Sequence, residues 1–180
     1  MGDSFCELAR FERNAFVLAM FFASWYNVSN ISMLYLGTDH QGFRTKERLK
    51  HWLESKQIPY KDMGSFSFHK ADDYPDFASF VARAVQQSPQ RHRGILLCGS
   101  GVGVSIVANK FRNIRAALCA TPAIAKASRS DDNSNVLALP ASFLSWPALQ
   151  RIVSVWLTAP FSGFSRHKRR IAKIHRIERL

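Results

Sequence analysis

Residues 94–105 read GILLCGSGVGVS, an apolar strand that runs directly into a thiol and a glycine-rich turn. Ile95 to Leu97 have the pattern of a buried strand, and Val104 to Lys110 have that of a helix. Between them, three glycines at alternate positions allow a tight turn and a close approach of the backbone to a ligand: Gly99, Gly101 and Gly103. A helix that opens at such a turn presents unpaired N–H groups and the positive end of its dipole. The stretch therefore predicts a strand–turn–helix unit whose turn suits a phosphate or a developing oxyanion.

Cys98 stands at the junction of this strand and this turn. A helix N-terminus beside a cysteine can lower the pKa of the thiol, which makes Cys98 a candidate for chemistry. The spacing differs from the dinucleotide fingerprint, in which the third glycine comes one residue later, and the Gly-Lys-Ser/Thr of a Walker loop is absent. The turn is therefore a phosphate or enediolate cradle of another kind, or else an ordinary connection between a strand and a helix.

Strands and helices alternate on both sides of this unit. Strands are predicted at Met33–Leu36, Pro59–Met63, Ile95–Leu97, Arg115–Cys119 and Val136–Leu139. Helices are predicted at Phe43–Ser55, 75–85, Val104–Lys110, Pro122–Ser128 and Trp146–Leu157, and a basic amphipathic helix closes the chain. This alternation predicts an α/β protein with a three-layer, Rossmann-like fold, in which a five-stranded parallel sheet carries helices on both faces.

In such a fold, ligands bind at the carboxyl ends of the strands. The first strand ends at Asp39 and His40, and the third ends at Cys98 and Ser100. We therefore expect these four side chains to share one crevice. Cys119 lies within a predicted strand, and we interpret it as a packing residue.

Composition narrows the class of protein. The 180 residues predict one domain with a sizeable core. The formal net charge is +12, and much of it lies in the last fifteen residues, a pattern that suits nucleic acid, an acidic membrane surface or phosphorylated substrates. The three cysteines are odd in number and widely spaced, a pattern that does not indicate a disulfide framework or a zinc site and that favours a reducing cytoplasm.

The N-terminal segment stands outside this pattern. Residues 15–26, AFVLAMFFASWY, are densely apolar but fewer than the roughly 20 that a spanning helix needs. We interpret residues 1–32 as an extension that covers a partner surface, and residues 33–180 as the folded domain. A signal or anchor segment, and a true start at Met33, are the alternatives.

Several motifs in order resemble the ribose-5-phosphate isomerase B family, which includes galactose-6-phosphate isomerase subunits. They are Gly37-Thr38-Asp39-His40-Gln41-Gly42-Phe43, Asp73-Tyr74-Pro75-Asp76-Phe77-Ala78, Gly94 to Ser105, Ala108-Asn109-Lys110, Ile114-Arg115-Ala116, Ser128-Arg129, Asn135-Val136-Leu137-Ala138 and Arg166-His167-Lys168-Arg169-Arg170. The resemblance covers about Met33 to Ile174.

The resemblance implies an aldose–ketose isomerase of the pentose phosphate pathway, which interconverts ribose 5-phosphate and ribulose 5-phosphate through a cis-enediolate. It implies catalytic roles for Cys98, as the base, and for Ser100, where the family often has threonine. It also implies that the substrate is bound by Asp39, His40, Tyr74, Gly99, Gly101, Val102, Gly103, Asn109, Arg166, His167 and Arg170. It implies no metal and no cofactor, and it implies a cytoplasmic homodimer or tetramer. The sites would lie at the dimer interface, where Arg166 and Arg170 reach the phosphate from the neighbouring subunit.

Three positions depart from the family pattern. The family usually reads Ser-Arg-x-His-Asn where this chain has Ser128-Arg129-Ser130-Asp131-Asp132. Asp131 replaces the ring-opening histidine, Asp132 replaces a sugar-contacting asparagine, and Ser142 aligns with a phosphate-binding arginine. Asp131 is then either a substitute acid or base, or a solvated loop residue, and His167 of a neighbouring subunit is a candidate for the lost imidazole.

These departures leave two alternatives to the ribose 5-phosphate reaction. One is a related isomerase with a different sugar-phosphate specificity, and the other is a non-catalytic relative that binds a phosphorylated sugar. A nucleic-acid binder that uses the basic tail is a weaker alternative, because the isoleucine stripe of that tail needs a surface to pack on. We expect neither nucleic acid nor a membrane as a partner.

Overall fold

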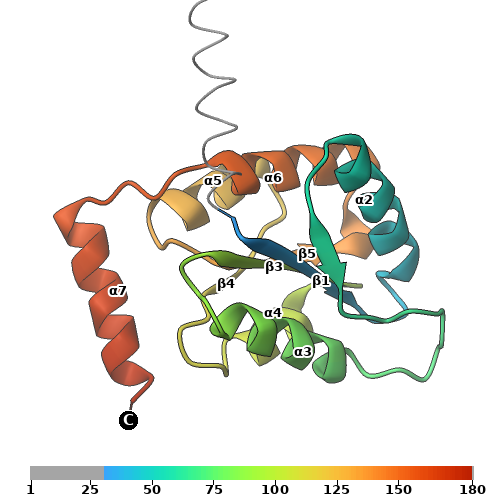
Figure 1. The fold of residues 1–180 in the computed structure, drawn as a ribbon, viewed down its shortest axis with the longest axis horizontal. Coiled ribbons are helices and arrows are strands. Elements are labelled where there is room, and N and C mark those ends of the chain that lie inside the picture. Colours follow the sequence, from blue (N-terminus) through green and yellow to red (C-terminus); the bar gives the residue numbers. More distant parts are fainter. Residues whose placement is uncertain (1–30, 180) are drawn as a thin grey trace, which may run out of the picture.

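The computed structural model describes residues 31–179 (Figure 1). The expectations for residues 1–30 and for Leu180 lie outside the described residues. The strands are β1 (Met33–Thr38), β2 (Tyr60–Asp62), β3 (His92–Cys98), β4 (Ala116–Leu118) and β5 (Val136–Pro140). The helices are α2 (Phe43–Ser55), α3 (Tyr74–Gln86), α4 (Val102–Ala108), α5 (Pro122–Ser130), the 3₁₀ turn η1 (Ala141–Phe143), α6 (Trp146–Thr158) and α7 (Ser165–Ile177).

The five strands form one parallel sheet in the order β2-β1-β3-β5-β4, as the sequence predicts. Helices α2, α5 and α6 cover one face of the sheet, and α3 and α4 cover the other (Figure 1). Two apolar clusters fill these two interfaces. The predicted three-layer α/β fold is therefore confirmed.

The central strands explain why the sheet is buried on both faces. Every residue of β5 is buried, and so is β3 from Gly94 to Cys98. Such continuous apolar runs are typical of parallel strands that lie between two helix layers. The side chains of Leu97 and Leu139 pack with α2 and α6, whereas Leu96 and Ala138 pack with α3 and α4.

The sheet order places a topological switch point between β1 and β3. The chain leaves β1 toward β2 on one side, then returns to build the rest of the sheet on the other side of β1. Ligands in such sheets bind in the crevice beyond the carboxyl ends of the two strands at this point. Thr38 at the end of β1 pairs in register with Leu97 near the end of β3. The fold therefore brings Asp39 and Cys98 to the same crevice.

Helix α7 lies apart from the layers, beside the β4 edge of the sheet (Figure 1). A cleft of about 550 Å³ separates it from the body, and Ile174 and Ile177 line this cleft. The helix begins at Ser165, earlier than its isoleucine pattern alone indicates. Across residues 31–179, no helix has both the length and the apolar character that crossing a membrane requires.

Candidate active site

Cys98 and Asp39 form a hydrogen-bonded pair at the switch point. The Cys98 Sγ donates to Asp39 Oδ2 at 3.1 Å, and both side chains are buried. The other carboxylate oxygen, Oδ1, accepts from the main-chain N–H groups of Gln41 and Gly42 at 3.1 and 3.2 Å. These bonds hold Asp39 in the turn between β1 and α2, so the carboxylate faces the thiol from a fixed position.

The surroundings of Cys98 raise the pKa of its thiol to about 11. Burial is the largest cause, and the hydrogen bond and negative charge of Asp39 act in the same direction. The main-chain N–H groups of Gly99 and Gly101 oppose this rise but do not outweigh it. The sequence indicated that the adjacent helix N-terminus can lower the thiol pKa, but the burial and the carboxylate, which sequence reasoning did not consider, outweigh that effect.

The glycine-rich turn passes directly from Cys98 into α4. Gly101 has φ +73°, and a Cβ there would lie 2.7 Å from Leu118 Cδ1 and 3.0 Å from the carbonyl carbon of Leu139. Only glycine adopts this conformation in so little space without strain. The Oγ of Ser100 accepts from the N–H of Val102 at 3.3 Å, so Ser100 lies at the mouth of the turn.

Tyr74 and Gln41 border the same turn. A Cβ on Gly103 would lie 2.7 Å from the Tyr74 ring, which therefore packs directly on the first turn of α4. The end of the Gln41 side chain covers Gly99 in the same way, at 1.8 Å from the position of an added Cβ. Sequence reasoning included Tyr74 among the site residues but missed Gln41, whose position within a matching motif was the one available signal.

His40 is held by a carboxylate that sequence reasoning also missed. Asp72 Oδ1 accepts from the His40 main-chain N–H at 2.9 Å and lies 2.6 Å from Nδ1 of the same residue. The pKa of His40 is raised above its ordinary value of 6.5, chiefly by the side-chain hydrogen bond to Asp72 and further by the charge of Asp39. Asp72 is 32 residues away in the sequence, in the loop before α3, and no spacing pattern connects the two.

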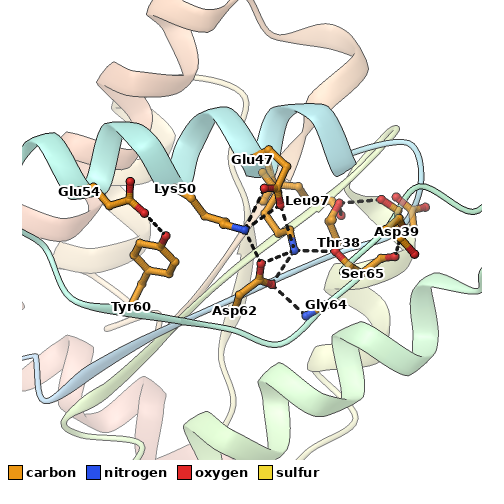
Figure 2. A network of polar contacts seen from close by, with 12 residues as sticks. Thr38, Asp39, Glu47, Lys50, Glu54, Tyr60, Asp62, Gly64, Ser65 and Leu97 are labelled. Atoms are coloured by element: carbon orange, nitrogen blue, oxygen red, sulfur yellow. Dashed lines mark hydrogen bonds and ion pairs between the residues drawn. The ribbon is translucent and has the colours of Figure 1, made fainter.

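A buried ion-pair network supports the loop that carries Asp72 (Figure 2). Lys46 is fully buried, and its Nζ donates to Asp62 Oδ1 at 2.5 Å and to the main-chain oxygen of Ser65 at 2.7 Å. Ser65 N–H in turn donates to the carbonyl of Thr38, at 2.8 Å. Lys50 completes the network with a 3.0 Å bond to Asp62 Oδ2. The network therefore connects α2 and β2 to the end of β1, one residue before Asp39.

Asp131 and Asp132 lie at the opposite, amino edge of the sheet. Arg115, which precedes β4, donates from Nε to the Asp132 carbonyl at 2.9 Å. Gly94 pairs with Val136 at this edge, whereas Cys98 pairs with Pro140 at the other. Four residue steps of strand separate the two edges, which is about 13 Å. Within one chain, these carboxylates do not reach the thiol.

Helix α7 also lies along the amino edge. The imidazole of His167 is buried, with Nδ1 2.7 Å from Ser162 Oγ and 3.8 Å from Asp131 Oδ1. Arg166 donates from Nε to His167 Nε2 at 3.0 Å, while Arg166 and Arg170 remain exposed. The structure therefore places all five of these predicted site residues in a second group, apart from Cys98.

Asn109, for which the family resemblance implies a substrate contact, makes structural hydrogen bonds in this chain. Its Nδ2 donates to the carbonyls of Ser105 and Ala116 at 3.0 and 2.9 Å, and its Oδ1 accepts from the Ala116 N–H at 2.8 Å. The amide therefore ties the end of α4 to β4. In the described part of the chain, no group of three or more His, Cys, Asp or Glu side chains is placed to hold a metal ion.

Comparisons with known proteins agree with this geometry. The family described as Ribose/Galactose Isomerase matches residues 34–174 of this chain. Probable ribose-5-phosphate isomerase B of Mycoplasma genitalium is 40% identical over 146 residues, which cover 81% of this chain and 95% of that protein. Ribose-5-phosphate isomerase B of Escherichia coli K12 is 40% identical over 142 residues, which cover 79% of this chain and 93% of that protein.

Solved structures give the same result. The crystal structure of ribose-5-phosphate isomerase B from Mycoplasma genitalium with bound ribulose-5-phosphate aligns with a TM-score of 0.80 at 40% sequence identity. The alignment covers 83% of this chain and 98% of that one.

Proposed function

Because this chain belongs to the ribose/galactose isomerase family, we propose that it interconverts ribose 5-phosphate and ribulose 5-phosphate. The relatives named above are ribose-5-phosphate isomerases B, and one of them binds ribulose-5-phosphate. The observation that carries the proposal is the Cys98–Asp39 pair, 3.1 Å apart, beside a turn of main-chain N–H groups. This arrangement supplies a base and donors for a developing oxyanion, which are the two needs of an enediolate reaction.

The proton transfers of the proposed reaction balance within this pair. Cys98 first passes its proton to Asp39 Oδ2, because a thiol with a pKa near 11 is not a base at neutral pH. The thiolate then takes the proton from C2 of the open-chain sugar. The C–H electron pair becomes the C1=C2 double bond, and the carbonyl electrons move to O1.

The turn after Cys98 then stabilises the negative charge on O1 through main-chain N–H groups. The O2 proton moves to O1, a carbonyl forms at C2, and the Cys98 thiol returns its proton to C1. The thiolate finally recovers the proton held by Asp39. In this proposal the exposed Ser100 hydroxyl hydrogen-bonds an enediolate oxygen.

We also propose that each active site is completed by a second copy of the chain. Arg166 and Arg170 are exposed cations suited to a phosphate, but they lie on α7 at the amino edge, away from Cys98 of their own chain. Exposed apolar side chains lie on α4, on β4, which is the next strand but one from that of Cys98, and on α5, namely Val102, Ile106, Leu118 and Ile124. Such a surface favours an interface between subunits. A homodimer would bring α7 of one subunit to the crevice of the other.

Asp131, Asp132 and Ser142 favour a second candidate, a related isomerase with another sugar phosphate as its substrate. Asp131 Oδ1 lies 3.8 Å from Nδ1 of the buried His167, and the half-exposed carboxylate of Asp131 is the candidate acid or base in place of a ring-opening histidine. A carboxylate near a phosphate is unfavourable, so these replacements favour a substrate that differs from ribose 5-phosphate. The free thiols of Cys98 and Cys119 favour a reducing compartment, such as the cytoplasm, as the place where this protein acts.

The test is turnover of purified protein on a panel of sugar phosphates with four, five and six carbons. We expect the highest kcat/KM for ribose 5-phosphate. A higher value for a six-carbon or four-carbon substrate would assign the second candidate. No turnover of any member, with binding retained, would assign a non-catalytic relative.

A further inference from the structure

One carboxylate oxygen of Asp72 contacts His40 at two atoms, the main-chain nitrogen and the ring Nδ1. Asp72 Oδ1 accepts from the main-chain N–H at 2.9 Å and pairs with the ring Nδ1 at 2.6 Å. The Asp72 side chain is only 10% exposed, whereas the imidazole is 25% exposed. Two bonds to the same acceptor fix both the backbone and the ring, so Nδ1 is committed to Asp72 and Nε2 remains to donate elsewhere.

Both carboxylates that face His40 favour its charged form. Asp72 contacts the ring directly, and Asp39 is the preceding residue and adds a second negative charge. The aromatic ring of Phe68 packs edge-to-face on the imidazole, with centroids 6.4 Å apart, and brings no charge. Asp39 already engages Cys98 and two main-chain N–H groups, so Asp72 is the carboxylate that bonds His40 directly.

We propose that Asp72 is a positioning residue, which keeps the His40 imidazolium charged and directed at the phosphate group of the substrate. This inference rests on the proposed function, which supplies the phosphorylated sugar. It has a particular weight in this chain, because Ser142 stands where the family pattern has a phosphate-binding arginine. Because that position lacks a cation here, His40 supplies a larger share of the electrostatic attraction for the phosphate dianion.

The charge of Asp72, rather than its shape, is the quantity to test. Asp72→Asn keeps an acceptor for the main-chain N–H but removes the negative charge, so the imidazole should lose its proton at lower pH. Asp73→Asn is the matched control, because Asp73 is the exposed neighbouring aspartate and its side chain makes no cap hydrogen bond with α3.

The first measurement is kcat and KM for ribose 5-phosphate at about pH 6 and about pH 8. In Asp72→Asn we expect KM to rise by roughly tenfold at the higher pH and to rise less at the lower pH, which favours the protonated form of His40 in both proteins. The kcat should change by no more than about twofold, since an interaction made equally in ground and transition states affects KM alone. Equal kinetics of Asp72→Asn and Asp73→Asn at both pH values would overturn the proposal.

The second measurement needs no turnover, so it separates this inference from the proposed function. An NMR titration of the imidazoles in the full chain, with His40 assigned by its loss in His40→Gln, should give His40 a pKa above 6.5 in the wild type. Asp72→Asn should lower this pKa, and Asp72→Glu should retain the rise. If the wild type shows this shift but turns over no sugar phosphate, the proposed function is rejected and the role of Asp72 in charging His40 is retained. An unshifted His40 in an active enzyme would do the opposite.

Discussion

At Cys98, burial and a neighbouring carboxylate both oppose formation of the thiolate in the free protein. A base with a raised pKa removes a proton strongly once it is formed, but it must first lose its own. Asp39 is the group that can take that proton, because it lies 3.1 Å from the sulfur and is fixed by two main-chain N–H groups. The residue-level account is therefore a pair, Cys98 with Asp39, rather than a lone activated cysteine.

The reactivity of the thiol tests this pairing. Alkylation of Cys98 by iodoacetamide at about pH 8 should be slow in the wild type and roughly tenfold faster in Asp39→Asn, because removing the carboxylate lowers the thiol pKa by about one unit. Peptide mapping by mass spectrometry reads each cysteine separately, and Cys119, which is fully buried, serves as the internal control. An equal or slower rate in Asp39→Asn would contradict the pairing.

The glycine-rich turn after β3 is tightly packed, and the conformation of Gly101 is essential to it. Gly101→Ala introduces both left-handed strain and contacts of 2.7 to 3.0 Å with Leu118, Leu139 and Pro140. Gly163→Ala is the matched control: its φ is +67°, but the nearest atom lies 3.9 Å away.

Strain alone should cost Gly163→Ala about 1 kcal/mol in the free energy of unfolding. Gly101→Ala should cost at least about 1 kcal/mol more, because the added methyl group meets backbone atoms that cannot move away. Its kcat/KM should also fall by at least tenfold, because the turn that would hold the enediolate is displaced. Urea denaturation and turnover measure the two effects, and equal stabilities of the two variants would argue against a tightly packed turn.

The ion-pair network of α2 and β2 makes a second prediction at this scale (Figure 2). Lys46→Met leaves part of the Asp62 charge and the Ser65 carbonyl buried without their cation, so it should cost about 2–4 kcal/mol of unfolding free energy. Lys50 binds the same carboxylate but is 23% exposed, and Lys50→Met should cost less than about 1 kcal/mol. Chemical denaturation measures both, and similar losses in the two variants would contradict the assigned difference.

Much of this element-level structure could be predicted from sequence. The α2 boundaries agree with the apolar pattern of Phe43–Ser55, and β3 and β5 stand out as continuous apolar runs. The start of α4 is two residues earlier than expected, because Gly101 in a left-handed conformation permits the helix to begin at Val102. The edge strands β2 and β4 shorten to three residues each, since the sequence pattern carries no signal for where pairing stops.

At the scale of the whole molecule, the sequence predicted the identity of the site residues better than the contacts between them and their positions on the sheet. Asp39 and Cys98 follow from the rule on strand ends. The His40–Asp72 contact does not follow, because Asp72 lies in the loop between β2 and α3, whose path has no signal in the sequence pattern. The position of Asp131 and α7 at the opposite edge is likewise a consequence of topology: α5 runs from the carboxyl edge to the amino edge.

A shared site predicts complementation between two defective chains. Cys98→Ser and Arg170→Ala should each be inactive alone. Co-expressed, half of the dimers are mixed, and each mixed dimer has one site with both intact residues, so about a quarter of wild-type activity should return. No recovery, in a preparation shown to contain mixed dimers, would mean that Arg170 does not act across the interface.

The most direct test of the account follows the proton itself. Purified wild-type protein is incubated with ribose 5-phosphate in D₂O, and ¹H NMR follows the C2 hydrogen of the sugar and the C1 hydrogens of the product. We predict that the wild type forms ribulose 5-phosphate with deuterium at C1, because the proton that the Cys98 thiolate takes from C2 exchanges with D₂O before the thiol protonates C1. Cys98→Ser should bind the substrate yet lose at least about 10²-fold of this rate, and Cys119→Ser should retain it. Undiminished exchange in Cys98→Ser, or none in the wild type, would contradict the assignment of Cys98 as the base.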